Sequence, residues 1–182
     1  MKNILFIISL IATSLFITAC KNDPHKGDNT QNSNETTSNV EEDYNGFIEF
    51  DLRPYELNAS LMVPEEDRTL IKHKLDTYEW DLIKGKQTYI TIQDWGMING
   101  FEKYLEKLDN QSQKVEFIEK EKNFTVYKLT TGTSKVTYHT AAQYEFDGVN
   151  YIFESSQQGL SEDGVKNAIV SVRSVEKISV NF

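Results

Sequence analysis

Between residues 114 and 155, apolar and polar side chains alternate along the chain, and three short turns interrupt the alternation. A period of two is typical of β-strands that bury one face. The turns lie at residues 122–123, 132–134 and 147–148. The last contains Gly148, which tolerates the positive φ angle that a two-residue hairpin needs. The pattern predicts a four-stranded antiparallel meander.

The longest strand of this meander predicts which side chains face the core. The side chains expected to point inward are those of Val136, Tyr138, Thr140, Ala142, Tyr144 and Phe146. His139, Gln143 and Glu145 alternate with them and are expected to face solvent.

Further strand patterns flank the meander. One alternating run covers residues 57–63 and ends at Pro64, and residues 78–82 and 87–94 form a hairpin around Gly85. A last short strand is predicted over residues 178–182.

Two segments have a helical period instead. The apolar positions of the first are Met97, Phe101, Tyr104, Leu105 and Leu108, and those of the second are Val165, Ala168, Ile169, Val172 and Val175. Ser161 is the expected N-cap of the second helix, with Glu162 and Asp163 in its first turn. The sequence therefore predicts an α+β fold, an antiparallel sheet with a C-terminal meander and two packed helices.

The N-terminus has a different character. Lys2 precedes an apolar run over residues 4–16, which is shorter than the roughly 20 residues of a membrane span but fits a signal peptide. The run ends at Ile17-Thr18-Ala19-Cys20, which resembles the bacterial lipobox. The resemblance implies cleavage between Ala19 and Cys20, and a diacylglycerol and an acyl chain such as palmitate on Cys20.

Two alternatives to lipidation remain open at this point. One is an ordinary cleaved signal peptide that leaves a free thiol, and the other is an uncleaved signal anchor. Lipidation accounts better for the single Cys of an exported chain, which has no partner for a disulfide within the chain. Lys21, rather than Asp, follows Cys20, and in Gram-negative lipoproteins this favours the outer membrane over the inner one.

The sequence therefore divides into residues 1–19, a signal peptide; 20–43, a lipidated Cys and a disordered polar tether; and 44–182, one α+β domain. The tether is rich in Asn, Ser and Thr and too polar to form a core. The chain's 2 Trp, 9 Tyr and 10 Phe all lie in the third segment, except Phe6 and Phe16.

The charge balance excludes two classes of partner. The chain has 19 basic and 28 acidic side chains, a net charge of -9, and no basic tract. Nucleic acids and anionic lipid surfaces are bound by clustered Lys and Arg. The expected membrane contact is therefore the lipid anchor.

Five segments of the domain carry a resemblance to a known fold: residues 50–55, 62–64, 80–92, 144–153 and 165–175. Together they resemble the PsbP-like fold, also called the Mog/PsbP type, which DcrB-type bacterial lipoproteins share. The resemblance implies a small accessory or binding protein without catalytic activity, and the fold itself fixes no chemistry.

The sequence contains no motif for a catalytic site, a metal or a cofactor. Ser155-Ser156 has no sequence cue that links it to His73 or His139, and the spacing around His25 matches no metal loop. His73 is expected to be a structural, hydrogen-bonded histidine and His25 a solvated one. Carboxylates are plentiful, but no pair stands out as the two that a glycosidase needs.

One segment is a candidate for binding. Trp95, with Asp94 and Gly96 beside it, lies at the predicted junction of a strand and a helix. Trp95 would stack on a sugar or anchor a partner; the alternative is that it covers the core while the glycines form a turn.

The predicted function is a membrane-anchored envelope lipoprotein that binds an envelope protein or glycan without catalysis and without a cofactor. A hydrolase of envelope polysaccharide with an unidentified carboxylate pair is the alternative. A purely structural or stress-related surface protein is a third.

Overall fold

A computed structural model of the chain describes residues 44–65, 68–132 and 134–179. The predicted signal peptide, Cys20 and the tether with His25 lie outside the described residues. The elements are β1 (Phe47–Asp51), a 3-10 turn η1 (Arg53–Tyr55), β2 (Ala59–Pro64), β3 (Thr69–Lys74), β4 (Glu79–Lys84), β5 (Gln87–Asp94), α1 (Phe101–Asp109), β6 (Lys114–Lys120), β7 (Phe124–Thr131), β8 (Lys135–Phe146), β9 (Val149–Ser155), α2 (Glu162–Arg173) and β10 (Glu176–Lys177).

The described strands form two antiparallel sheets. The larger has seven strands in the order β3-β4-β5-β9-β8-β7-β6, and the smaller has the order β1-β2-β10. The predicted meander is confirmed, since β6, β7, β8 and β9 pair in sequence order. Asp147 and Gly148 have φ angles of 53° and 81° in the last hairpin, as its sequence predicted. The fold is α+β.

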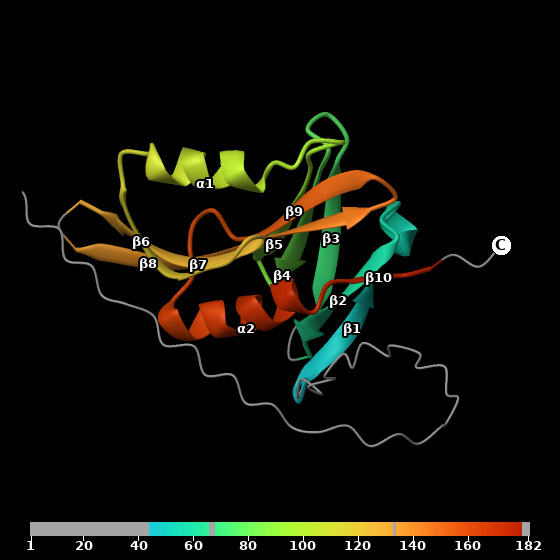
Figure 1. The fold of residues 1–182 in the computed structure, drawn as a ribbon. Coiled ribbons are helices and arrows are strands. Elements are labelled where there is room, and N and C mark those ends of the chain that lie inside the picture. Colours follow the sequence, from blue (N-terminus) through green and yellow to red (C-terminus); the bar gives the residue numbers. More distant parts are fainter. Residues whose placement is uncertain (1–43, 66–67, 133, 180–182) are drawn as a thin grey trace, which may run out of the picture. The chain divides into compact units, whose positions relative to one another are not determined.

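The two helices cover opposite faces of the seven-stranded sheet, as Figure 1 shows. We call these the α1 face and the α2 face. The α2 face is also covered by β2 of the small sheet, which contacts α2. β8 and β9 are therefore buried between two layers rather than one.

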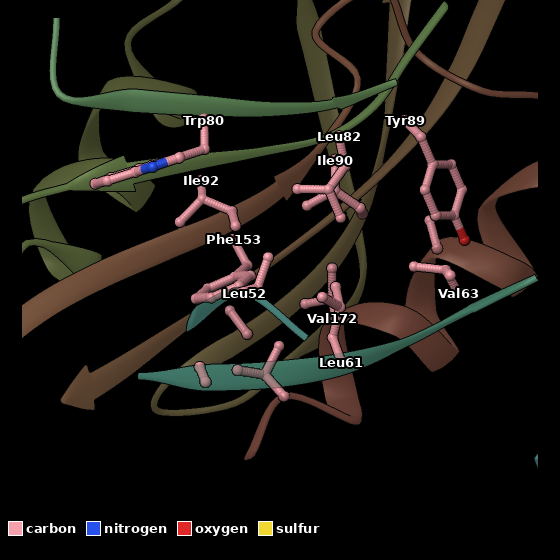
Figure 2. Packing of buried hydrophobic residues seen from close by; sticks show 14 of the residues in the cluster. Leu52, Leu61, Val63, Trp80, Leu82, Tyr89, Ile90, Ile92, Phe153 and Val172 are labelled. Atoms are coloured by element: carbon pink, nitrogen blue, oxygen red, sulfur yellow. The ribbon is translucent and has the colours of Figure 1, made fainter. Parts of the chain in front are cut away.

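The main core fills the space under the α2 face. Figure 2 shows that Leu82, Ile90 and Ile92 of the large sheet are directed toward Leu61 of β2 and Val172 of α2. All five are fully buried. Trp80 also belongs to this core, and its indole nitrogen donates to the Tyr55 carbonyl at 3.0 Å. Val165, Ala168, Ile169 and Val172 lie in α2, as the sequence predicted, whereas Val175 was also predicted in this helix and follows its end at Arg173.

A second, smaller core lies under α1. Phe101, Tyr104 and Leu108 point from α1 onto Ala141 of β8 and Ile152 of β9. Phe101 is fully buried. The four predicted helix positions from Phe101 to Leu108 lie in α1, but Met97 precedes the helix and is 89% exposed. That part of the prediction is wrong, because residues 95–100 form an irregular connection that holds Met97 away from the sheet.

The structure corrects the predicted orientation of β8. Thr140, Ala142 and Phe146 are buried, as expected, but Val136, which was also predicted to point inward, is 45% exposed. However, His139 and Gln143 were predicted to face solvent, and they are only 3% and 7% exposed. They lie on the α1 face, which α1 and its preceding loop cover.

The two helices begin in different ways. Ser161 caps α2 as predicted, because its hydroxyl oxygen accepts from the Gly164 backbone nitrogen at 3.0 Å. No side chain of α1 caps the N-terminus of that helix. Instead Gln143 Oε1 accepts from the backbone nitrogens of Gly100 and Phe101, at 2.9 Å each. A strand thus supplies the cap of α1.

The C-terminal strand is also displaced from its prediction. β10 consists of Glu176 and Lys177, and Ile178 follows it and donates its backbone N–H to the Asn58 carbonyl. Val180 and Phe182 lie outside the described residues. No helix in the described part of the chain is long and apolar enough to cross a membrane.

Candidate functional site

A pocket of about 260 Å³ opens on the α1 face, between α1 and the sheet. We call it the α1 pocket. Strands β5, β7, β8 and β9 form its floor, and α1 and the residues after it form one wall. Its lining includes the side chains of Trp95, Tyr104, Lys107, Gln111, His139 and Glu154.

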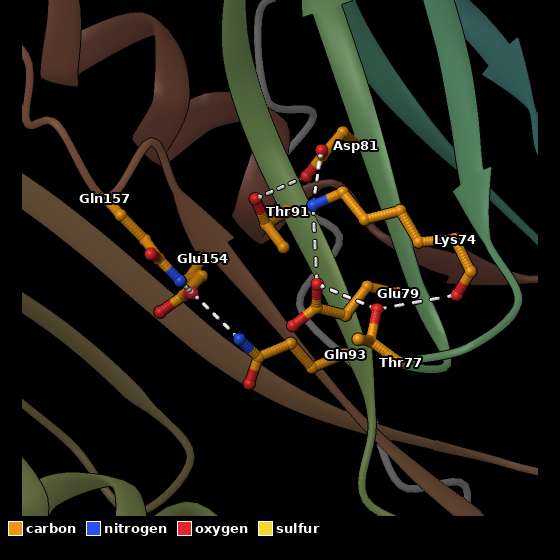
Figure 3. Close-up of polar contacts among 8 residues, drawn as sticks. All are labelled: Lys74, Thr77, Glu79, Asp81, Thr91, Gln93, Glu154 and Gln157. Carbon is orange, nitrogen blue, oxygen red and sulfur yellow. Dashed lines mark hydrogen bonds and ion pairs between the residues drawn. The ribbon is translucent and has the colours of Figure 1, made fainter.

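Glu154 is the central charged group of the α1 pocket. β9 places it on the α1 face, where it is 7% exposed. Figure 3 shows Gln93 and Gln157 donating to its carboxylate, and both bonds end on Oε1, at 3.0 and 3.2 Å. Burial raises the pKa of Glu154, while hydrogen bonds from Gln157 and Tyr104 act in the opposite direction.

Two tyrosines join α1 to the sheet beside this carboxylate. The hydroxyls of Tyr104 and Tyr127 lie 3.0 Å apart and share a hydrogen bond. Burial raises the pKa of both phenols, so they stay protonated. They therefore serve as neutral hydrogen-bonding groups.

His139 is held in its neutral form. Its ring stacks on Tyr127 with the centroids 5.1 Å apart, and its Nε2 lies 2.9 Å from the Thr137 hydroxyl. Burial lowers the pKa of His139 to about 4, although a hydrogen bond to the Ser156 backbone acts against this. A ring nitrogen that bonds a backbone carbonyl donates, and the other then accepts from Thr137.

Ser155 lines the same pocket, so the fold brings it near His139, although no sequence motif linked the two residues. Its hydroxyl oxygen accepts from the Thr140 backbone nitrogen at 3.0 Å. The imidazole of His139 is engaged by Thr137 and Ser156. The two side chains are thus engaged with other partners rather than arranged as a nucleophile and its base.

Of the three residues predicted for binding, Trp95 alone lines the α1 pocket. Its indole nitrogen donates to Gln93 Oε1 at 3.2 Å. Asp94 instead accepts from the Gly96 backbone nitrogen at 2.6 Å, and Gly96 has a φ angle of 62°, so these two residues form the turn. A Cβ on Gly100 would lie 2.1 Å from the Trp95 ring, so a glycine there lets the indole pack closely.

A second pocket, of about 300 Å³, lies next to the first on the part of the sheet formed by β3, β4 and β5. We call it the polar shelf. In Figure 3 the Lys74 ammonium lies between Asp81 and Glu79, at 2.7 and 3.4 Å. The hydrogen bond with Asp81 is the main reason that the pKa of Lys74 is raised. Gln157 lines both the polar shelf and the α1 pocket, which makes them neighbours.

The remaining candidates have structural surroundings. His73 stacks on Trp80 with the ring centroids 4.5 Å apart. Among residues 44–65, 68–132 and 134–179, no three His, Cys, Asp or Glu side chains are grouped as a metal site would require. Glu154, Tyr104 and Gln111 were not predicted as site residues, because nothing in their spacing separates them from ordinary strand and helix positions.

No protein-family model matches the sequence, and no curated protein is significantly similar to it.

Proposed function

We propose that this chain is a membrane-anchored lipoprotein of the bacterial envelope whose α+β domain binds an envelope partner in the α1 pocket without catalysis. One observation carries the choice of binding over catalysis. Among the described residues of the pocket, no hydrogen bond joins a nucleophile to a base, because the His139 ring bonds Thr137 and the Ser155 oxygen accepts from the Thr140 backbone.

The arrangement of carboxyl groups supports the same choice. Glycosidases use two carboxyl groups on either side of the scissile bond. Among the described residues that line the α1 pocket, Glu154 is the one carboxyl group. The carboxylates of the polar shelf, Glu79 and Asp81, are paired with Lys74.

The anchor is proposed from the sequence. The residues Ile17-Thr18-Ala19-Cys20 after an apolar run support lipidation of Cys20, and Lys21 supports the outer membrane as its location. Two or more acyl chains hold a protein stably at a membrane, whereas one does so marginally. A PsbP-like relationship remains part of this proposal.

Anchoring is tested by the Cys20→Ala variant. We expect it to lose labelling by a fatty-acid analogue and to leave the membrane fraction, because no site for the acyl chains remains. Retained labelling would contradict the anchor.

Binding is tested with two tryptophan substitutions at the α1 pocket and beside it. Gln111→Trp places a large ring in the pocket, whereas Glu106→Trp places the same ring on an exposed position of α1. The full chain in mild detergent is incubated with solubilised envelope fragments, and the retained material is quantified. We expect Gln111→Trp to lose at least about tenfold in affinity, which corresponds to 1.4 kcal/mol. Equal retention by both variants would contradict binding in the pocket.

A hydrolase remains the second candidate, because the raised pKa of Glu154 is a property that general acids share. Glu154→Gln distinguishes the two functions. A hydrolase would bind envelope glycans but release no reducing ends after this substitution, whereas wild-type protein would release them. If neither protein releases reducing ends, the hydrolase is excluded.

A further inference from the structure

The α1 pocket contains a buried hydrogen-bond donor that has no partner. The Gln111 side-chain nitrogen Nε2 is buried, and no described residue accepts from it. Leaving a buried donor unpaired is unfavourable, because the donor has lost its bond to water without gaining another. The side chain lines the pocket, so an acceptor on a bound molecule would satisfy it.

The charged side chains of the α1 pocket balance each other. Its lining has one acid, Glu154, and one base, Lys107, and its other polar groups are amides, hydroxyls and the neutral imidazole of His139. A ligand with several charges of one sign would find only one opposite charge in the pocket, and it would also lie beside a charge of its own sign. A neutral molecule with several hydroxyl groups finds both donors and acceptors.

Aromatic rings lie among these polar groups. Trp95, Tyr104 and Tyr127 line the α1 pocket, and the indole is fixed by Gln93 and by its contact at Gly100. Apolar surface combined with a few fixed polar groups is typical of small-molecule sites. A sugar ring presents the matching surfaces, because it carries C–H groups on its faces and hydroxyls at its edge.

The sizes of the two pockets indicate the length of the ligand. The α1 pocket, at about 260 Å³, is slightly smaller than the 300–1,000 Å³ or so of drug-sized sites. It therefore suits one ring. The polar shelf adds about 300 Å³ on the other side of Gln157. If one sugar ring occupied the α1 pocket, the next sugar of the same chain would reach the polar shelf.

We infer that the α1 pocket holds one neutral sugar ring of an envelope glycan and that the polar shelf holds the adjoining sugar. The inference rests on the proposed binding function and names the class of ligand. Gln111 Nε2 donates to a ring substituent, and Trp95 packs against the ring.

The class of ligand is tested on envelope fragments treated in two ways. Protease digestion removes proteins and leaves glycans, whereas anhydrous trifluoromethanesulfonic acid cleaves glycosidic bonds and leaves peptide bonds. We expect the full chain in detergent to retain protease-treated material and to lose at least about tenfold in retention after the acid treatment. Retention that survives the acid but not the protease would overturn the sugar while leaving the binding function intact. Equal retention by wild type and Gln111→Trp would instead overturn the binding function itself.

The role of Gln111 is tested by Gln111→Leu, which keeps the volume and removes the unpaired donor. We expect the free protein to be as stable as wild type or more stable, since no bond within the described structure is lost, while the affinity for the protease-treated glycan falls several-fold. An unchanged affinity would overturn the proposed contact. A loss of stability would mean that the amide serves the fold instead.

The two-site arrangement is tested by Gln158→Trp, an exposed substitution on the polar shelf. We expect weaker retention of the protease-treated glycan than wild type shows, and no change in the binding of single sugars released by hydrolysis of the same glycan. Unchanged retention of the intact glycan would overturn the second sugar position. Glu106→Trp is the matched control.

Discussion

The two faces of the seven-stranded sheet are both covered, but by layers of different chemistry. Under the α2 face the main core is apolar and comes from both sheets and α2, and the few buried polar groups beside it include Thr140 and Ser171. Under the α1 face, apolar contacts lie beside buried polar groups such as Gln143, His139 and Glu154. Figure 1 shows that α1 runs over only part of its face.

This difference indicates that the two faces contribute differently to stability and to binding. A closed apolar core gains free energy from burial and contains few polar groups that could bind a ligand. A partly covered polar layer costs more to bury, because each polar group needs a partner. The pocket, the unpaired Gln111 nitrogen and the perturbed Glu154 and His139 all lie on the α1 face. We therefore expect the α2 face to determine folding and the α1 face to determine function.

The largest expected effect concerns the apolar cores. Phe153 and Phe101 are both fully buried, on the α2 and α1 faces respectively. Phenylalanine to alanine in a core costs about 3–5 kcal/mol, depending on how far the site can collapse. In urea unfolding, we expect the loss of stability to be about 5 kcal/mol for Phe153→Ala and about 3 kcal/mol for Phe101→Ala. The second loss is smaller because α1 can move toward the sheet and fill part of the cavity. Equal costs would mean that both faces contribute equally to folding.

Lowering the pH should reduce the stability of the folded state through His139, which lies on the α1 face. Its pKa falls from 6.5 to about 4 on folding, so the unfolded chain binds more protons between these values. Stability is therefore complete above pH 6.5 and falls by about 3 kcal/mol as the pH drops to 4. Glu154 acts with the opposite sign, since its raised pKa makes the folded state gain protons first. His139→Gln should flatten the pH dependence of unfolding between pH 6.5 and 4, and an unchanged slope would exclude His139 as its source.

The cap of α1 tests how the α1 face is assembled. Gln143→Ala leaves the Gly100 backbone nitrogen without its acceptor and the Asn150 side-chain oxygen without its donor, while the Phe101 backbone nitrogen keeps only its longer bond to Asn99 Oδ1, at 3.4 Å. Buried groups that lose a partner cost about 1–3 kcal/mol, so we expect a loss of about 2 kcal/mol and faster amide hydrogen exchange in α1. Unchanged exchange in α1 would show that the helix does not depend on this cap. Glu145→Ala, an exposed change on the same strand, is the control.

The smallest effect should come from the local cap of α2. Ser161→Ala removes the acceptor for Gly164 and should cost about 1 kcal/mol, with the free energy of unfolding as the measurement. If Ser161→Ala costs more than Gln143→Ala, the local cap contributes more than the cap that β8 supplies. Ser161→Asp keeps an acceptor and should restore most of the stability.

Much of the fold was predictable because its signals are local. The hairpin at Asp147-Gly148 needs positive φ angles over two residues, and the α2 cap needs Ser161 three residues before the amide that it binds. The order of the meander follows from short turns, which leave successive strands little choice but to pair. These features depend on neighbours in the sequence.

The α1 face was not predictable in the same way. The period of two in β8 separated the side chains of Ala142 and Gln143 correctly into two faces, but it contained no information on whether the second face would be covered. That depends on α1, whose Phe101 meets Gln143 from more than 40 residues away in the chain. Glu154 likewise meets Gln93 from β5 only because β9 pairs there.

The sequence alone thus predicted the meander, the β4–β5 hairpin, most of both helices and the α+β class, since each depends on residues close together in the chain. It did not predict β1 or β3, and the lipid anchor at Cys20 stays a prediction. The tertiary structure decided which polar residues are buried and where a ligand would fit. Burial and the pKa values that it shifts arise from contacts between distant segments. The site formed by Glu154, His139 and Gln111 therefore exists only once α1 has docked on the sheet.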